Sequence, residues 1–370
     1  MPMTFLKKFP TITLALACLG LALAPVADAA IHKPAKVKKA PKKPAIDYSG
    51  EFVNFGQWKD VQQFMGDLEL KHGVPIAESE KLFLELRYID AAVQLVKPAP
   101  PGKPKNWQAY SSRFIEPKRI NAGVEFWSAN RDTLARAEAL YGVPAEIIVG
   151  IIGVETIYGR DMGKFRVLDV LATLAFSYPL TPNREARMEF FRGELEAAIV
   201  SARQTGIDPL SLTGSYAGAV GMPQFMPSNI YKLGVDFDGD GKVDLRNSPA
   251  DAIGSVANFL IAHGWKRDDP ARLAYPATVS PERGWEKYLG TGLEAQYSGA
   301  DLLAAGVHPD ADLPPGLYGL VDLQNGPEPT EYWVGSNNFF SITKYNRSYF
   351  YAMSVVELGR AVKLSMKETL

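Results

Sequence analysis

Apolar side chains recur every three or four residues along most of this chain, and that spacing predicts a mainly α-helical protein. Between residues 57 and 96 it predicts two or three helices. Further helices are expected at about 121–141, 166–176, 184–205, 248–263 and 348–364. Residues 267–330 contain more proline, glycine and aspartate and only short apolar runs, without a long helical period. We expect a small β-rich insertion there.

One apolar segment, from Val143 to Gly159, carries a charged residue on its buried side. Pro144 suits the first helical position, and isoleucine and valine then recur at helical spacing until Gly159. At about 100° per residue, Glu155 projects from the apolar stripe while Glu146 faces the opposite side. An apolar setting raises the pKa of a carboxyl toward neutral pH, which makes it able to act as a general acid. The alternative is a structural ion pair between Glu155 and a core arginine.

Two glycines, Gly150 and Gly153, interrupt the same predicted helix. Each glycine costs a helix interior about 1 kcal/mol relative to alanine. We therefore expect another backbone or a ligand to approach this helix closely.

The N-terminus has the pattern of an export signal. Lys7 and Lys8 precede an apolar run from about residue 11 to 26, which is followed by the small-residue site Ala27-Asp28-Ala29. The run is too short and alanine-rich for a membrane span, so we expect cleavage after Ala29 and a soluble periplasmic product. The single cysteine, Cys18, lies inside this run. Its acylation, which would give an outer-membrane lipoprotein, is the alternative, although the usual leucine three residues before the cysteine is missing.

Residues 30–46 (AIHKPAKVKKAPKKPAI) have the composition of a solvated tether, with lysine, proline and alanine and little other apolar content. The whole chain has a formal net charge of −1. Because the tether carries six lysines and the signal a net charge of +1, residues 47–370 carry about −8. A folded part without a basic surplus argues against nucleic-acid binding. The basic tether allows proximity to anionic polymers or lipid headgroups, although a spacer is its favoured role.

Residues 236–247 match the spacing of a calcium-binding loop. Position 12 of this loop, where a bidentate glutamate usually completes the shell, is Asn247, so an acid further along must replace it. The segment Ser248-Pro-Ala-Asp251 also predicts a helix N-cap, which is the alternative role of its aspartate. We expect a structural Ca²⁺, because no water-activating partner stands nearby in the sequence. The predicted ligands are Asp236, Asp238, Asp240, Lys242 and Asp251.

Two other passages combine amides, hydroxyls and aromatic rings, which suits the wall of a groove that binds sugars. The first is the glycine-rich loop 212–228, and the second is the aromatic passage 337–346. The loop is no phosphate cradle, because no Gly-Lys-Ser/Thr follows its glycines. For both passages the alternative is a purely structural role. The histidines, at positions 32, 72, 263 and 308, lack ligand spacing and suggest no zinc site.

Three passages together carry a family resemblance: Gly153-Val-Glu-Thr-Ile-Tyr-Gly159, Gly214-Ser-Tyr-Ala-Gly-Ala-Val-Gly-Met-Pro-Gln-Phe-Met-Pro-Ser228 and Asn338-Phe-Phe-Ser-Ile-Thr-Lys-Tyr-Asn346. With them the chain resembles the membrane-bound lytic murein transglycosylase B family, the glycoside hydrolases of family 103. The likeness covers nearly everything from about residue 50 onward. After the signal at 1–29 and the tether at 30–46, it implies a helical N-terminal part at 47–140, a lysozyme-like catalytic core with the calcium loop at 141–266 and a small β-rich part at 267–335. Residues 336–370 then return to the core and end in a final helix.

The resemblance also implies roles for particular residues. It makes Glu155 the single catalytic acid and base. Two departures from the family pattern stand out: familiar members are often lipoproteins, and the calcium loop here is one residue longer before Asp251, which weakens the case for that ligand. The residues that fall at substrate-groove positions are Ser215, Gln224, Asn338, Tyr345, Arg187 and Tyr110.

The implied reaction needs only one carboxyl. A lytic transglycosylase cleaves the β-1,4 bond between N-acetylmuramic acid and N-acetylglucosamine in peptidoglycan and leaves a 1,6-anhydromuramic acid end. A hydrolase would need a second carboxylate, and none stands out in the sequence. The alternatives are a hydrolytic muramidase and a non-catalytic peptidoglycan-binding protein. The implied partner is the glycan strand of peptidoglycan, and we expect a monomer.

Overall fold

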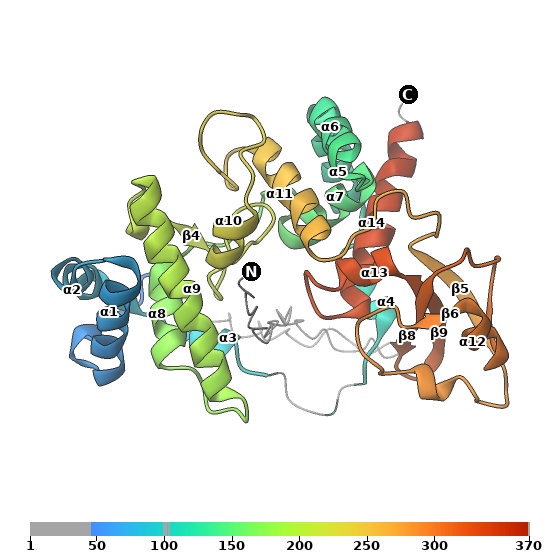
Figure 1. The fold of residues 1–370 in the computed structure, drawn as a ribbon, viewed down its shortest axis with the longest axis horizontal. Coiled ribbons are helices and arrows are strands. Elements are labelled where there is room, and N and C mark those ends of the chain that lie inside the picture. Colours follow the sequence, from blue (N-terminus) through green and yellow to red (C-terminus); the bar gives the residue numbers. More distant parts are fainter. Residues whose placement is uncertain (1–45, 99–101, 103, 369–370) are drawn as a thin grey trace, which may run out of the picture.

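The computed structural model describes residues 46–98, 102 and 104–368. The predicted signal, Cys18 and all of the tether except Ile46 lie outside these residues. The described chain is mainly helical, as predicted (Figure 1). Its α-helices are α1 (Lys59–His72), α2 (Ile76–Glu85), α3 (Asp90–Leu95), α4 (Trp107–Ser111), α5 (Pro117–Ala129), α6 (Arg131–Tyr141), α7 (Ala145–Thr156), α8 (Val167–Phe176), α9 (Arg184–Thr205), α10 (Pro227–Leu233), α11 (Pro249–Ala262), α12 (Gly299–Ala304), α13 (Asn337–Ile342) and α14 (Tyr349–Glu368).

The helices pack around two separate hydrophobic cores. In the first, α1–α3 cover α8 and α9, and the rings of Phe64, Phe83 and Phe176 meet edge to face. In the second, α7 is enclosed by α5, α6, α11 and α14. The predicted N-terminal helical part at 47–140 is therefore shared between two packing units, because α4–α6 join the second core.

The third core belongs to a small antiparallel sheet at the opposite end of the molecule from α1 and α2 (Figure 1). Tyr275, Tyr318 and Val334 are buried on its inner face. The strand order is β6-β8-β9-β5-β7. The strands lie within the predicted β-rich stretch or end one residue beyond it: β5 (Ala274–Val279), β6 (Tyr297–Ser298), β7 (Val307–Pro309), β8 (Leu317–Asn325) and β9 (Glu328–Ser336). The expectation of a small β-rich insertion is confirmed.

Two further strand pairs tie distant loops together. The strands β1 (Glu51–Phe52) and β2 (Arg87–Tyr88) pair at the start of the described chain. The strands β3 (Phe165–Arg166) and β4 (Thr213–Gly214) hold the beginning of the glycine-rich loop beside the segment that follows α7.

The helix predicted at about 121–141 is wrong in one respect, because the structure divides it into α5 and α6. Asn130 lies at the break with a non-helical backbone, φ −119° and ψ 25°. Its side-chain amide donates a hydrogen bond of 2.8 Å to the carbonyl oxygen of Phe126. Asparagine competes for backbone partners in this way, and apolar spacing does not reveal such a break.

Close backbone contact between α7 and α14 explains the glycines inside α7. A Cβ atom at Gly150 would collide with the carbonyl oxygen of Val355, and one at Gly359 would collide with the carbonyl oxygen of Glu146. A Cβ atom at Gly153 would collide with the hydroxyl of Tyr158. The expectation that another backbone approaches this helix is therefore confirmed.

This contact gives a stability prediction. We expect Gly150→Ala to lower the free energy of unfolding by about 2 kcal/mol, because overpacking against backbone outweighs the gain in helix propensity. Denaturant titration would measure the change. The matched control is Gly66→Ala in α1, where an added Cβ meets nothing within 4 Å. That variant should gain about 0.5–1 kcal/mol, and equal effects of the two substitutions would contradict the argument.

No single helix in the described ranges is both long and apolar enough to cross a membrane. The helices α6 and α7 pass the same length and composition test only as a pair bent by 115°.

Candidate active site and calcium loop

Glu155 lies in the last turn of α7 and faces α14. Its Oε1 atom accepts a hydrogen bond of 2.6 Å from the phenol of Tyr351. None of the ion pairs of the described residues includes Glu155, so the alternative of a structural pair with a core arginine is not what the structure contains. Glu146, in the first turn of α7, is paired with Lys363, which also lies on α14. The prediction that Glu146 and Glu155 face opposite sides of the helix is therefore not confirmed.

The electrostatics around Glu155 leave a substantial fraction of its carboxyl protonated near neutral pH. Burial raises the pKa of its carboxyl from 4.5 to about 7, against the smaller effect of the Tyr351 hydrogen bond, which lowers it. The pKa of Tyr351 is itself raised well above 10, first by burial and then by the neighbouring Glu155. Tyr351 therefore remains a hydrogen-bond donor over the whole physiological range.

The end of α7 is different from the prediction, because the helix stops at Thr156 and not at Gly159. Ile157 and Tyr158 take left-handed backbone angles, φ 52° and 57°. Such angles are strained for side chains of this size and persist only where the surroundings hold them. Thr156 supplies one restraint, since its hydroxyl donates a 2.8 Å bond to the carbonyl of Met222. This bond ties the glycine-rich loop to the helix that carries Glu155.

The glycine-rich loop is held in shape by its own hydrogen bonds. The Ser215 hydroxyl oxygen accepts bonds from the amides of Ala217 (3.3 Å) and Ala219 (3.0 Å). Gln224 has a left-handed backbone, φ 51°, and its side-chain amide donates to the carbonyl of Gly221 at 2.9 Å. Val220 and Phe225 pair through their backbones as an isolated antiparallel β-bridge, which closes the turn. The loop thus presents Gln224 in a fixed position.

Two predicted groove residues lie beside the partner of Glu155. The ring of Tyr345 stacks on that of Tyr351 with centroids 6.3 Å apart, and its hydroxyl donates to the carbonyl of Pro223 at 2.6 Å. Tyr110, on α4, packs edge to face on Phe350 at 5.4 Å and lies near enough to affect the pKa of Tyr351. The structure therefore gathers Glu155 with tyrosines from three separate elements.

The other two predicted groove residues lie on α9 and α13. Arg187 is on α9, where its charge acts on Tyr178. Asn338 is buried, and its side-chain amide bonds to the main chain of Lys266: Oδ1 accepts from the amide nitrogen at 2.7 Å and Nδ2 donates to the carbonyl at 2.9 Å. Asn338 thus connects α13 to the residues that follow α11, and its predicted role in substrate binding stays a prediction.

Sequence reasoning missed Tyr351. It stands in the final helix among Tyr349, Phe350 and Met353, and nothing in that apolar pattern distinguishes the one ring that reaches Glu155. Only the packing of α14 on α7 identifies it.

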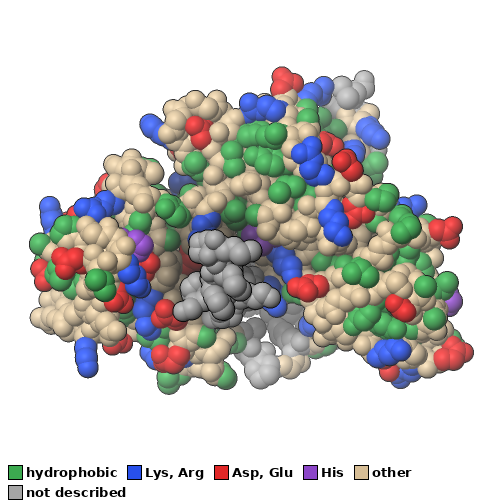
Figure 2. Space-filling view, viewed as in Figure 1, with side chains coloured by type: hydrophobic (Ala, Val, Ile, Leu, Met, Phe, Trp, Pro, Cys, Tyr) green, Lys and Arg blue, Asp and Glu red, His purple; other side chains and the backbone are tan. Residues whose placement is uncertain are grey.

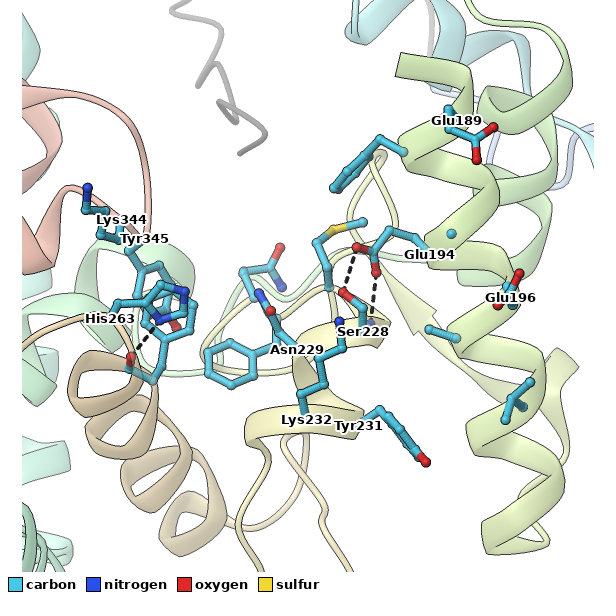
Figure 3. A pocket seen from close by; sticks show the side chains of 18 of the residues that line it. Glu189, Glu194, Glu196, Ser228, Asn229, Tyr231, Lys232, His263, Lys344 and Tyr345 are labelled. Carbon is cyan, nitrogen blue, oxygen red and sulfur yellow. Dashed lines mark hydrogen bonds between the residues drawn. The ribbon is translucent and has the colours of Figure 1, made fainter. Parts of the chain in front are cut away.

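A cavity of about 950 Å³ opens beside this site, between α9, α10, α11 and residues 344–347 (Figure 3). Gln224 and Tyr345 line it, so it adjoins the surroundings of Glu155, although Glu155 itself is not among the lining residues. Glu194 forms part of the far wall, where its carboxylate accepts from the Ser228 amide (2.9 Å) and hydroxyl (2.7 Å). Acidic and basic side chains are intermixed over this face of the molecule, without a continuous basic patch (Figure 2).

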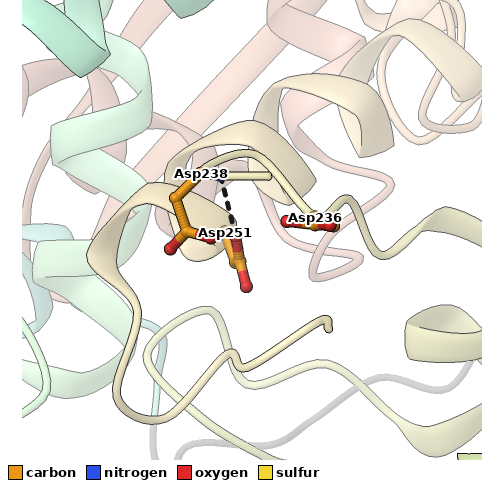
Figure 4. Close-up of side chains that lie close together, drawn as sticks. All are labelled: Asp236, Asp238 and Asp251. Atoms are coloured by element: carbon orange, nitrogen blue, oxygen red, sulfur yellow. Dashed lines mark hydrogen bonds between the residues drawn. The ribbon is translucent and has the colours of Figure 1, made fainter. Parts of the chain in front are cut away.

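The calcium loop brings three of its predicted ligands together. One carboxylate oxygen each from Asp236, Asp238 and Asp251 lie within 4.8 Å of one another (Figure 4). Asp251 is buried, and it also accepts from the amides of Phe237 and Asp244, both at 2.8 Å. No ion pair in the described ranges neutralises these three acids, so their close approach suits a hard divalent cation.

The remaining predicted ligands are placed differently. The Asp240 carboxylate lies outside that group of three and accepts from the Lys242 amide at 2.9 Å. The predicted N-cap is Ser248, whose hydroxyl oxygen accepts a 3.2 Å bond from the Asp251 amide. The two interpretations are compatible, because Asp251 contributes only its backbone amide to the cap and its carboxylate faces the loop.

A helical fold that holds a buried, protonatable carboxyl next to an open cavity is typical of enzymes of the lysozyme-like class, which cleave glycosidic bonds by acid catalysis. Residues 56–360 match the family model described as the transglycosylase SLT domain. The chain belongs to this family of lytic murein transglycosylases.

Known relatives agree with this assignment. The chain is 41% identical over 336 residues to membrane-bound lytic murein transglycosylase B of Escherichia coli K12, covering 88% of each chain. The structure of the E. coli lytic transglycosylase Slt35 in complex with calcium is 42% identical with a TM-score of 0.75, covering 86% of this chain and 96% of that one. SltB3 of Pseudomonas aeruginosa, in complex with NAG-anhNAM-pentapeptide, is 29% identical with a TM-score of 0.68, covering 84% and 80%.

Proposed function

We propose that Glu155 is the single acid and base with which this lytic transglycosylase cleaves peptidoglycan. Protonated Glu155 gives its proton to the glycosidic oxygen between N-acetylmuramic acid and N-acetylglucosamine, and the bond to C1 of the muramic acid breaks. The substrate's N-acetyl group stabilises the cation at C1. The Glu155 carboxylate then takes the proton of the muramyl 6-hydroxyl as O6 bonds to C1. The product is a 1,6-anhydro end, and Glu155 is again protonated.

The observation that carries this proposal is the buried carboxyl of Glu155, whose hydrogen bond comes from the Tyr351 phenol and not from a cation. Burial and the Tyr351 hydrogen bond account for its pKa of about 7, and no other carboxyl of the described residues contributes to that shift. A hydrolase needs a second carboxyl about 5–10 Å from the first. A reaction in which one group acts first as acid and then as base fits this site better.

Product analysis tests the proposal against its two alternatives. Sacculi digested with the protein should release fragments with 1,6-anhydromuramic acid ends, which mass spectrometry distinguishes from reducing ends because they are lighter by one water molecule. Reducing ends would indicate a hydrolytic muramidase. Binding to sacculi without release of fragments would indicate a non-catalytic peptidoglycan-binding protein.

The remaining predictions from the sequence belong to the same proposal. The glycan strand lies along the cavity, with Gln224 and Tyr345 on its wall and with Ser215, Tyr110, Arg187 and Asn338 as further groove positions. The complex of SltB3 with a muropeptide fragment supports this substrate class. A substrate in the cell wall calls for export to the periplasm. The complex of Slt35 with calcium supports a structural Ca²⁺ held here by Asp236, Asp238 and Asp251.

The hydrogen bond from Tyr351 to Glu155 predicts a shift in the pH profile. The bond stabilises the carboxylate and lowers its pKa, so Tyr351→Phe should raise the pKa of Glu155 by about 0.5–1 unit. The limb of the kcat profile that reports protonated Glu155 should move to higher pH by the same amount. Tyr349→Phe, on the same helix, is the control, because that hydroxyl bonds to the carbonyl of Gly292. An unmoved or downward-shifted limb in the Tyr351 variant would count against the assigned pair.

A further inference from the structure

The histidine that follows α11 has a fixed orientation at the cavity. The His263 ring stacks on that of Phe259, with centroids 3.9 Å apart and planes 20° from parallel. The Nδ1 atom of His263 lies 2.7 Å from the carbonyl oxygen of Phe259 (Figure 3). A carbonyl oxygen can only accept, so Nδ1 must carry the proton.

This arrangement determines what the other ring nitrogen can do. Burial lowers the pKa of His263 below 6.5 against the opposing effect of the Phe259 hydrogen bond, and the charge of Lys344 lowers it further, which favours the neutral ring at physiological pH. In a neutral imidazole with a protonated Nδ1, the Nε2 atom is a hydrogen-bond acceptor. No hydrogen bond to Nε2 from a described residue is present in the structure.

His263 lies on the same wall as the groove residues next to Glu155. It lines the cavity with Gln224 and Tyr345. The Phe259 ring, on which it stacks, is 4.6 Å from the ring of Tyr345, and Tyr345 stacks on the partner of Glu155. His263 does not touch Glu155, so a sugar in contact with it is a neighbour of the one that is cleaved.

We propose that His263 is a substrate-binding residue whose Nε2 atom accepts a hydrogen bond from a sugar hydroxyl or N-acetyl N–H of the glycan. This inference rests on the proposed function, since it assigns a contact to the same groove. The neighbouring polar side chains of the wall include Lys344, paired with Glu294 at 3.2 Å, and the Asn229 amide. His263 adds a neutral acceptor whose tautomer is set by the fold.

Imidazole NMR tests the contact directly. The Glu155→Gln variant, labelled with ¹⁵N at histidine, is titrated with a tetrasaccharide of alternating N-acetylglucosamine and N-acetylmuramic acid. Before addition, the His263 signals should show a protonated Nδ1 and an unprotonated Nε2. On binding, the Nε2 signal should shift as it accepts a hydrogen bond, while the signals of His308, exposed on β7, stay in place. A reversed tautomer or an unmoved Nε2 signal overturns the proposal.

Kinetics provide the second measurement. His263→Phe keeps a ring on Phe259 but removes the acceptor, so KM for soluble glycan strands should rise about fivefold while kcat stays within about twofold. His263→Gln, which restores an acceptor, should recover part of the loss, and His308→Phe should change nothing. Melting temperatures check that each variant folds. An unchanged KM, or a fall in kcat alone, refutes the role of His263. The proposed function is tested independently of His263: it is wrong if the unmodified protein releases no fragments with anhydromuramic acid ends.

Discussion

Replacing Glu155 with glutamine is expected to reduce the release of anhydromuropeptides from sacculi by about a thousandfold. General acid and base catalysis together contribute on the order of 10²–10⁴ to a rate, and this site uses one group for both steps. Glutamine keeps the shape of the side chain and can accept the same bond from the Tyr351 hydroxyl. It cannot donate a proton to the glycosidic oxygen. Chromatography of the soluble fragments, identified by mass, measures the loss.

A matched variant on the same helix separates chemistry from packing. Glu146→Gln removes a carboxyl that is paired with Lys363 in the first turn of α7, nine residues before Glu155. We expect its activity to stay within about twofold of the unmodified protein, because a partly exposed ion pair contributes little. Full activity in Glu155→Gln, or equal losses in both variants, would remove Glu155 from the mechanism.

The same substitution should change stability with pH in a defined direction. The pKa of Glu155 is about 7 in the folded chain and 4.5 ordinarily. Between these values the folded state binds more protons than the unfolded state, so the free energy of unfolding falls as pH rises from 4.5 to 7. The total is about 2–3 kcal/mol. Glu155→Gln does not titrate, so its melting temperature relative to the unmodified protein should rise across that window. A difference that is independent of pH would contradict the raised pKa.

The sequence predicted those parts of the fold that depend on local periodicity. The bounds of α9 match the predicted 184–205, because the long amphipathic pattern between Arg184 and Thr205 is ended by a glycine. The place of Glu155 on an apolar helix was predictable for the same reason. The break at Asn130 was not, since a side-chain bond to the backbone leaves no trace in the apolar spacing.

Residue roles depended on contacts between distant segments, and there the sequence was a weaker guide. Asn338 and Tyr345 stand in one aromatic passage, yet Tyr345 lines the cavity while Asn338 is occupied by the main chain of Lys266. In the sequence both are polar side chains among aromatic residues, so composition does not distinguish their roles. Tyr351 contacts Glu155 of α7, and His263 stacks on Phe259. Neither contact can be predicted from the sequence around Tyr351 or around His263. The pattern identified the element that carries the acid, and packing identified its partners.

The calcium loop gives the second large effect. Asp251→Asn is expected to abolish calcium binding and to lower the free energy of unfolding by about 3 kcal/mol or more. The carboxylate of Asp251 is buried and lies among the oxygens of Asp236 and Asp238. Its two oxygens also accept from the amides of Phe237 and Asp244, which hold both arms of the loop. An asparagine nitrogen cannot accept the second of these bonds and carries no charge for the cation.

Calorimetry with and without a chelator measures the two contributions separately. In the unmodified protein, removing calcium should lower the melting temperature, since a ligand present at about 100 times its Kd stabilises the fold by about 2.7 kcal/mol. In Asp251→Asn the melting temperature should be lower from the start and should no longer respond to calcium. The control, Asp312→Asn, replaces an exposed aspartate outside the loop and should keep the full response. If the chelator leaves the unmodified protein unchanged, the three carboxylates hold no calcium and the loop is stabilised by its hydrogen bonds alone.

Asp251 lies in the first turn of α11, and Phe259 and His263 lie at the other end of that helix. A loosened loop should therefore also weaken the binding of glycan strands at the cavity.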